Sequence, residues 1–142
     1  MSGGEWLENL ILEAHGQEPN PISHTTSEPD MPTMTFNDYQ KRSREHAFYP
    51  DMNKNLTYPV IGLAGETGEI AEKVKKILRD KGGRFNAEDI EGLKKEIGDV
   101  LWYLAALATE LGLSFEEVAY ENLQKIEERS ARGTLKGSGD NR

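Results

Sequence analysis

The sequence predicts an all-α, four-helix-bundle-like domain whose bundle is completed by oligomerisation. Apolar residues recur with a period near 3.6 through most of the chain after residue 35, as they do in amphipathic helices. No segment alternates between apolar and polar residues as a half-buried strand does. Three of the four predicted domain helices carry wide apolar faces, which favours burial against a second subunit over a closed bundle within one chain of 142 residues.

Composition limits the functions that this chain can have. Lys and Arg total 17 against 25 Asp and Glu, which gives a formal net charge of -8 at pH 7. A generic binder of the nucleic-acid backbone carries a basic face, so nucleic acid is not an expected partner. The absence of cysteine excludes disulfides, thiolate metal sites and thiol nucleophiles. An anionic ligand would need a cation to offset the charge of the protein.

The chain divides into three predicted regions. Residues 1–34 form an N-terminal extension, with a short amphipathic helix at 5–14 and a proline-rich linker at 16–32. Residues 35–132 form the helical domain, and residues 133–142 form a glycine-rich mobile tail. There is neither a secretory signal nor an apolar stretch of the roughly 20 residues that a membrane span needs, so we expect a cytoplasmic protein without a membrane partner.

Local signals place the first two domain helices. Thr35 followed by Asp38 is an N-cap pattern, and the apolar period then predicts a helix over about 36–48. Residues 50–59 are polar and irregular and predict a loop. An apolar stripe predicts a second helix over about 60–80. The stripe comprises Leu63, Thr67, Ile70, Val74, Ile77 and Leu78.

Two further caps place the remaining helices. Capping boxes begin at Asn86 and at Ser114, and they predict helices over about 86–111 and 114–129. After Asp99 the third helix becomes apolar almost all round, so we expect it to be buried on several sides.

Four carboxylates border the apolar faces of the second and third helices. Glu66 and Glu69 lie three residues apart on the second helix, and Glu96 and Asp99 repeat this spacing on the third. Asp99 directly precedes an apolar run, so we expect it to have little access to water. Unneutralised carboxylates in such places cost several kcal/mol. A hard divalent cation would offset that cost, and oxygen ligands favour Mg²⁺ or Mn²⁺ over Zn²⁺ or Cu²⁺.

Two interpretations of these acids remain open. Acids beside an apolar stripe are commonly solvated residues at the flank of a helix. The glycines around the acids favour a functional site instead, because better helix formers would normally stand there. Glycines let helices approach closely or leave room for a ligand, and the four glycines are Gly62, Gly65, Gly68 and Gly98.

The spacing of the acids also carries a family resemblance. The stretch Gly62-Leu-Ala-Gly-Glu66-Thr-Gly-Glu69 is followed, after the 26 residues from Ile70 to Lys95, by Glu96-Ile-Gly-Asp99-Val-Leu-Trp-Tyr. This pattern resembles the Glu-x-x-Glu and Glu-x-x-Asp signature of the MazG-like all-α nucleoside triphosphate pyrophosphohydrolases. The resemblance covers about residues 36–132. It departs at Gly65, where many members carry a further Glu.

The resemblance implies a reaction and an assembly. Members hydrolyse nucleoside triphosphates between the α and β phosphates and release a nucleoside monophosphate and pyrophosphate. The resemblance implies that Mg²⁺ binds the four acids and that an acid of the second helix, Glu66 or Glu69, accepts a proton from the attacking water. It also implies a homodimer, or a homotetramer built of two dimers.

The same resemblance implies substrate contacts outside the acidic motif. Asn122, Lys125 and Arg129 fall three and four residues apart on the fourth helix and match a group that binds phosphate and sugar. Tyr103 matches a position in the base pocket. A solvated helix flank and ordinary core packing are the alternatives for these residues. Candidates for the opposite wall of the pocket are Phe36, Tyr39 and His46.

Two other functions would use similar features. A carboxylate-bridged di-iron bundle also places acids on facing helices, but it normally adds a Glu-x-x-His motif, which this sequence lacks. A non-catalytic helical interaction protein could use the acids to bind a structural metal or no metal. Hydrolysis that survives neutralisation of Glu96 or Asp99 would rule out a catalytic role for these acids.

Overall fold

A computed structural model describes residues 31–133. The expected helix at 5–14, most of the expected linker at 16–32 and the tail from residue 134 onward lie outside the described residues. The chain divides into two compact units, Met1–Thr33 and Met34–Arg142. Residues 31–33 of the first unit form no regular structure, and all the helices described below belong to the second unit.

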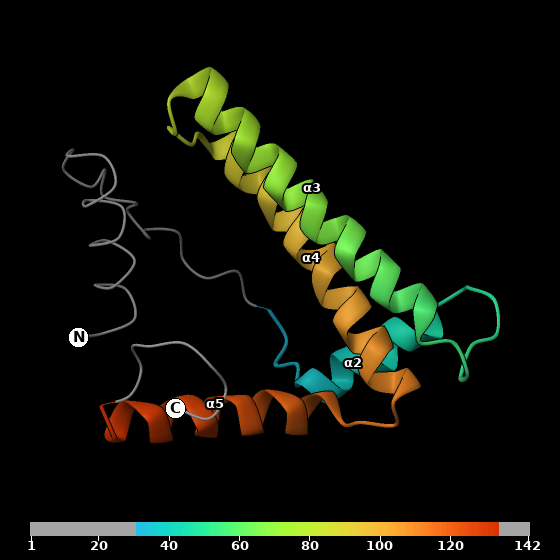
Figure 1. Cartoon of the computed structure of the whole chain (residues 1–142). Coiled ribbons are helices and arrows are strands. Elements are labelled where there is room, and N and C mark those ends of the chain that lie inside the picture. The colour runs from blue at the N-terminus through green and yellow to red at the C-terminus, as the bar shows by residue number, and fades with distance from the viewer. Residues whose placement is uncertain (1–30, 134–142) are drawn as a thin grey trace. The chain divides into compact units, whose positions relative to one another are not determined.

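The second unit is built from helices alone across its described residues, which confirms the predicted all-α class. The helices are α2 (Phe36–Glu45), α3 (Thr57–Lys81), α4 (Ala87–Glu110) and α5 (Phe115–Ala131). Helices α3 and α4 form a long antiparallel hairpin, and α2 packs across its open end against α4 (Figure 1). Helix α5 turns away from α4 at 106° and packs on α2 and α4, but not on α3.

No single helix among residues 31–133 is both long enough and apolar enough to cross a membrane. Helices α4 and α5 meet that test of length and composition only when they are joined across their bend.

Two of the three predicted N-caps are complete capping boxes. Thr35 and Asp38 bond to each other's backbone N–H groups at the start of α2, and Asn86 and Asp89 do the same at the start of α4. At the start of α5, the Ser114 hydroxyl accepts from the N–H of Glu117, as in the first half of a capping box.

The second half of that predicted box is replaced by contacts with α2. The Asn37 side-chain oxygen accepts from the Glu116 N–H at 3.1 Å, and the Gln40 side-chain oxygen accepts from the Phe115 N–H at 3.0 Å. The Gln40 amide also donates to the Leu113 carbonyl at 2.9 Å. Two side chains of α2 therefore fix the corner between α4 and α5.

The first two helices differ from the prediction at one end each. Helix α2 ends at Glu45, three residues before the predicted end. Helix α3 begins at Thr57, three residues before the predicted start. The early start is stabilised by the Asn55 side chain, which accepts from the Tyr58 N–H at 3.0 Å, and Pro59 is tolerated because it lies in the first turn.

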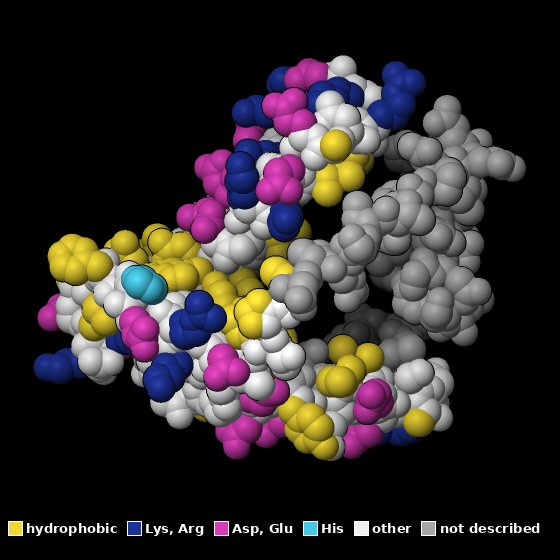
Figure 2. All heavy atoms as spheres, turned by 180° about the vertical axis from the view of Figure 1, so that it is seen from behind, with side chains coloured by type: hydrophobic (Ala, Val, Ile, Leu, Met, Phe, Trp, Pro, Cys, Tyr) yellow, Lys and Arg dark blue, Asp and Glu magenta, His cyan; other side chains and the backbone are white. Residues whose placement is uncertain are grey.

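The hydrophobic core of the single chain is small. Ala105, Ala108 and Phe115 are its buried members, and Tyr39 and Leu101 pack against them. The expectation that α4 is buried on several sides is therefore wrong for one chain. Ile90, Ile97 and Leu104 of α4 are exposed, and so is Leu111 directly after it. Figure 2 shows hydrophobic side chains on the surface where the hairpin meets α2, and mainly charged side chains over the distal part of the hairpin.

A buried glutamate attaches the loop between α2 and α3 to the end of α4. The Glu110 carboxylate has no exposed surface and accepts from the Arg44 guanidinium, the Tyr49 hydroxyl and the N–H groups of Asn53 and Asn55 at 2.5 to 3.1 Å. Burial alone would raise the pKa of Glu110, but these hydrogen bonds outweigh burial and lower it to about 2. The sequence analysis gave no sign of this cluster.

The Glu110 cluster predicts a stability contribution that depends on pH. The folded-state pKa of about 2 lies below the unfolded value of 4.5, so the contribution is complete above pH 4.5 and is lost as the pH falls from 4.5 towards 2. We expect Glu110→Gln to lower the free energy of unfolding at pH 7 by about 3 kcal/mol, measured by urea denaturation. The difference from the wild type should shrink below pH 4.5.

The exposed Glu121 of α5 offers a matched control. We expect Glu121→Gln to change the free energy of unfolding by less than about 0.5 kcal/mol. An equal loss for Glu110→Gln at pH 7 and at pH 3 would contradict the assignment.

Candidate metal centre

The α3–α4 hairpin brings three of the four predicted acids together. Glu66 of α3 faces Glu96 and Asp99 of α4, and one carboxylate oxygen from each lies within 4.8 Å of the other two. We call these three residues the acidic triad. Glu69 is exposed and is not part of the triad, although it lies one turn from Glu66. The expectation that Asp99 has little access to water is wrong, because Asp99 is exposed in the single chain.

The carboxylates of the triad repel one another because all of them are negatively charged when ionised. Partial burial raises the pKa of Glu66, and the charges of Asp99, Glu96 and Glu69 raise it further. Three carboxylates at this separation favour a bound cation. An all-oxygen donor set fits a hard divalent ion such as Mg²⁺ or Mn²⁺.

A lysine that the sequence analysis missed lies against the triad. The Lys73 Nζ is 3.4 Å from the Glu96 Oε1, and the two side chains are 39% and 18% exposed. Lys73 follows Glu66 by seven residues, which is two helical turns, and so it shares the face of α3 that carries the acid. The helical spacing alone could have drawn attention to it.

An aromatic row extends the same face of the hairpin. Tyr103 follows Asp99 by one turn of α4, as expected, and lies beside Tyr58 of α3 with ring centroids 6.4 Å apart. Tyr58 stacks in turn on Tyr49 at 4.8 Å. Burial raises the pKa of the Tyr103 hydroxyl, and the neighbouring Tyr58 and Glu66 raise it further.

Gly62 is what lets Tyr103 lie so close to α3. A Cβ atom at this position would stand 2.1 Å from the Cε1 of Tyr103. The predicted close approach of helices is therefore confirmed at Gly62. At Gly65, Gly68 and Gly98 an added Cβ would meet nothing within 4 Å, so these glycines border open space within the described chain.

Of the three candidates for the opposite pocket wall, the structure places Tyr39 near the triad. Burial raises the pKa of Tyr39, and the charge of Asp99 raises it further. Phe36 instead packs edge to face on the core residue Phe115 at 5.3 Å and is itself 44% exposed. His46 is exposed at the end of α2.

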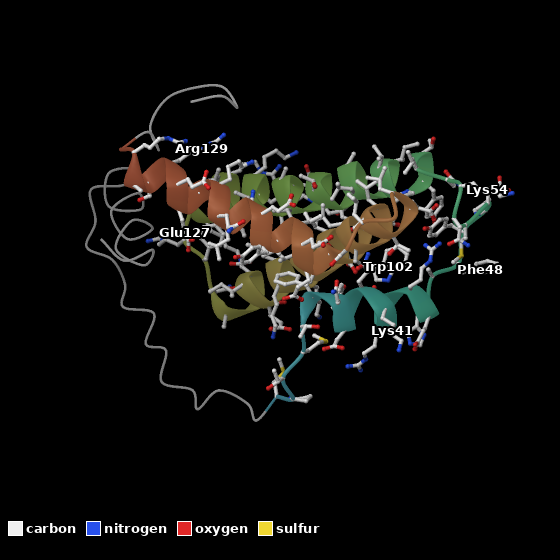
Figure 3. The ribbon with its side chains drawn as sticks, turned by 90° about the horizontal axis from the view of Figure 1, so that it is seen from below. Lys41, Phe48, Lys54, Trp102, Glu127 and Arg129 are labelled. Carbon is white, nitrogen blue, oxygen red and sulfur yellow. The ribbon has the colours of Figure 1, made fainter. Side chains whose placement is uncertain are left out.

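The predicted phosphate-binding residues of α5 do not reach the triad within one chain. Asn122 and Lys125 are exposed, whereas Arg129 is buried. Helix α5 makes no contact with α3. In Figure 3, Arg129 lies at the far end of α5 from Trp102 of α4, which neighbours Tyr103.

The family of this chain follows from comparison with known proteins. A family model for the MazG nucleotide pyrophosphohydrolase domain matches residues 57–133, more than half of the chain and the whole of α3, α4 and α5. The chain belongs to this family. The MazG match includes the acidic triad, Lys73 and Tyr103 but not α2.

A relative from Mycobacterium phage L5, the Gene 37 protein, is 47% identical over 109 residues, which cover 73% of this chain and 96% of that protein. No solved structure matches the chain.

The Gly62 contact predicts opposite effects for two helical glycines. Gly62→Ala would force the Tyr103 ring to move, and we expect it to lower the free energy of unfolding by about 1–3 kcal/mol. Gly92→Ala in α4 meets nothing within 4 Å, and better helix propensity should stabilise the protein by up to about 1 kcal/mol. Urea denaturation of both variants measures the difference, and stabilisation by both would contradict the close packing of Tyr103.

Proposed function

We propose that this MazG-family protein hydrolyses nucleoside triphosphates between the α and β phosphates, with Mg²⁺ as its cofactor and Mn²⁺ as a substitute. The products are a nucleoside monophosphate and pyrophosphate. The observation that carries the proposal is the acidic triad of Glu66, Glu96 and Asp99, which faces across two helices that belong to the MazG domain.

Charge explains why the reaction needs a cation. A triphosphate carries about three to four negative charges and the protein carries a net charge of -8, so the two repel each other. When bound, the divalent ion offsets phosphate charge and lowers the pKa of a coordinated water. The acidic triad would hold this ion. Glu69 lies beside the triad but outside it, so it is available to accept the proton of the attacking water.

The aromatic row would position the nucleoside. Tyr103 follows Asp99 by one turn of α4 and is partly buried, and the part of its ring that remains accessible can stack on a base. Phosphate and sugar contacts from Asn122, Lys125 and Arg129 would come from a neighbouring copy of the chain, because α5 does not reach α3 within one copy.

The exposed face of α4 supports a homo-oligomer. Ile90, Ile97, Leu104 and Leu111 recur every seven residues and are between 38% and 58% exposed. Apolar residues at this spacing form the seam of paired helices. Because the four residues of the seam are evenly spaced, the seam of one copy can pack antiparallel on the same seam of a second copy, related by a two-fold axis. Ile97 and Leu104 directly follow Glu96 and Tyr103 in the sequence, so a second copy packed on the seam would lie on the neighbouring face of α4.

Neutralising individual acids separates metal binding from proton transfer. We expect Glu96→Gln to weaken Mn²⁺ binding by about tenfold or more and to abolish measurable hydrolysis. Glu69→Gln should lower kcat by about 100-fold and leave Mn²⁺ affinity within about threefold. Product analysis of ribo- and deoxyribonucleoside triphosphates, with Mg²⁺ and with chelator, measures the reaction.

Glu72→Gln serves as the control, since Glu72 is on α3 and pairs with Lys75 and Lys76 away from the triad. This variant should retain both Mn²⁺ binding and hydrolysis. If the wild type releases no monophosphate or pyrophosphate from any nucleotide with either metal, the protein is a non-catalytic helical partner instead.

The apolar seam predicts a concentration-dependent assembly. The wild type should have the mass of a dimer or tetramer by light scattering, and Ile97→Gln should raise the dissociation constant by about tenfold or more. Phe48→Gln removes a 95% exposed ring that lies outside the seam and should leave the mass unchanged. A wild type that is monomeric at tens of micromolar would contradict the assembly.

A further inference from the structure

We propose that Lys73 is a phosphate-binding residue of this site. Without a metal, Lys73 is held by the Glu96 carboxylate. When a divalent cation binds Glu96, the cation displaces the ammonium group, which is then free to bind phosphate. The proposal rests on the proposed function, since the phosphate is that of the nucleotide or of the pyrophosphate product.

The contacts of the lysines on α3 single out Lys73. Lys75 and Lys76 pair with Glu72, and Lys81 pairs with Asp89 at the tip of the hairpin. Lys73 instead pairs with Glu96, a member of the triad, at 3.4 Å. Its side chain is still 39% exposed, so a ligand in solution can reach the ammonium group.

The ammonium group and a divalent cation compete for one carboxylate. Without a metal, Lys73 offsets part of the charge of the three acids. A doubly charged ion bound by the same acids repels the ammonium group at this distance. Lysine carries its charge on a flexible four-carbon stem, so Lys73 can move away from Glu96 without moving α3.

After leaving Glu96, the ammonium group of Lys73 would lie close to where a phosphate oxygen binds the metal. Neighbouring oxygens on an octahedral Mg²⁺ lie about 3 Å apart. An ammonium group that now contacts one ligand oxygen is therefore within reach of a phosphate oxygen bound next to it. The exposed cation of α5, Lys125, lies on a helix that makes no contact with α3 within the same chain, whereas Lys73 is a basic residue that one copy brings to its own triad.

Two binding measurements test this role without hydrolysis. Mn²⁺ affinity is measured by electron paramagnetic resonance without nucleotide, and pyrophosphate affinity by calorimetry at saturating Mg²⁺. We expect Lys73→Gln to tighten Mn²⁺ binding by about threefold to tenfold, because the competing cation is gone. The same variant should weaken pyrophosphate binding by about tenfold or more, because a charged hydrogen bond is lost.

Two further variants control for charge and for folding. Lys76→Gln removes the same charge from the same helix at the Glu72 pair, and both affinities should stay within about twofold of the wild type. Lys73→Arg keeps the charge and should retain pyrophosphate binding to within about threefold. Thermal unfolding with and without Mn²⁺ establishes that each variant is folded.

Either of two results would overturn the proposal. Weaker Mn²⁺ binding by Lys73→Gln would mean that Lys73 stays on Glu96 and orients it for the metal. Unchanged pyrophosphate binding would mean that the lysine has no phosphate role. A wild type that binds Mn²⁺ and pyrophosphate but hydrolyses no nucleotide would contradict the proposed function alone, so the two failures can be told apart.

Discussion

The contact between α3 and α4 is the constraint on which the rest of the site depends. These antiparallel helices come close enough for the Tyr103 ring to fill the place where Gly62 lacks a side chain. One turn further along each helix, the same contact puts Glu66 opposite Asp99 and Glu96. Like charges would push the helices apart, so packing at Tyr103 and the Lys73 ammonium group must offset the repulsion of the acids. A divalent cation would turn this repulsion into a bond between the two helices.

A second, independent set of interactions stabilises the open end of the hairpin. Glu110 gathers Arg44, Tyr49 and two backbone N–H groups of the loop between α2 and α3. That loop contains Asp51 and Asn53 with positive φ, a conformation that costs free energy for residues other than glycine. The hydrogen bonds of Glu110 hold the loop in this conformation, and Tyr49 stacks on Tyr58 as a result. A buried charge at the end of α4 therefore supports the aromatic row beside the triad.

Local patterns predicted the helices well, because capping and periodicity depend on residues that are near in sequence. The caps at Thr35 and Asn86 and the i, i+3 spacing of the acids are of this kind. The predictions failed where distant segments meet. Asn37 and Gln40 replace half of the box at Ser114, and Glu110 finds partners that no spacing rule places beside it. Lys73 shares a face of α3 with Glu66, but its partner Glu96 comes from the facing helix. The exposure of Asp99 and of the α4 seam has another cause, because burial there requires a surface that one chain does not supply.

We propose that Glu66, Glu96 and Asp99 form a divalent metal site in this MazG-family protein. The most direct test is anomalous X-ray scattering from crystals grown with Mn²⁺ and a nucleotide whose bridge between the α and β phosphates resists hydrolysis. We expect a manganese peak bound by these three carboxylates, with phosphate oxygens completing its coordination. Clear density for the three side chains without a peak at saturating Mn²⁺, or manganese bound only elsewhere, would contradict it.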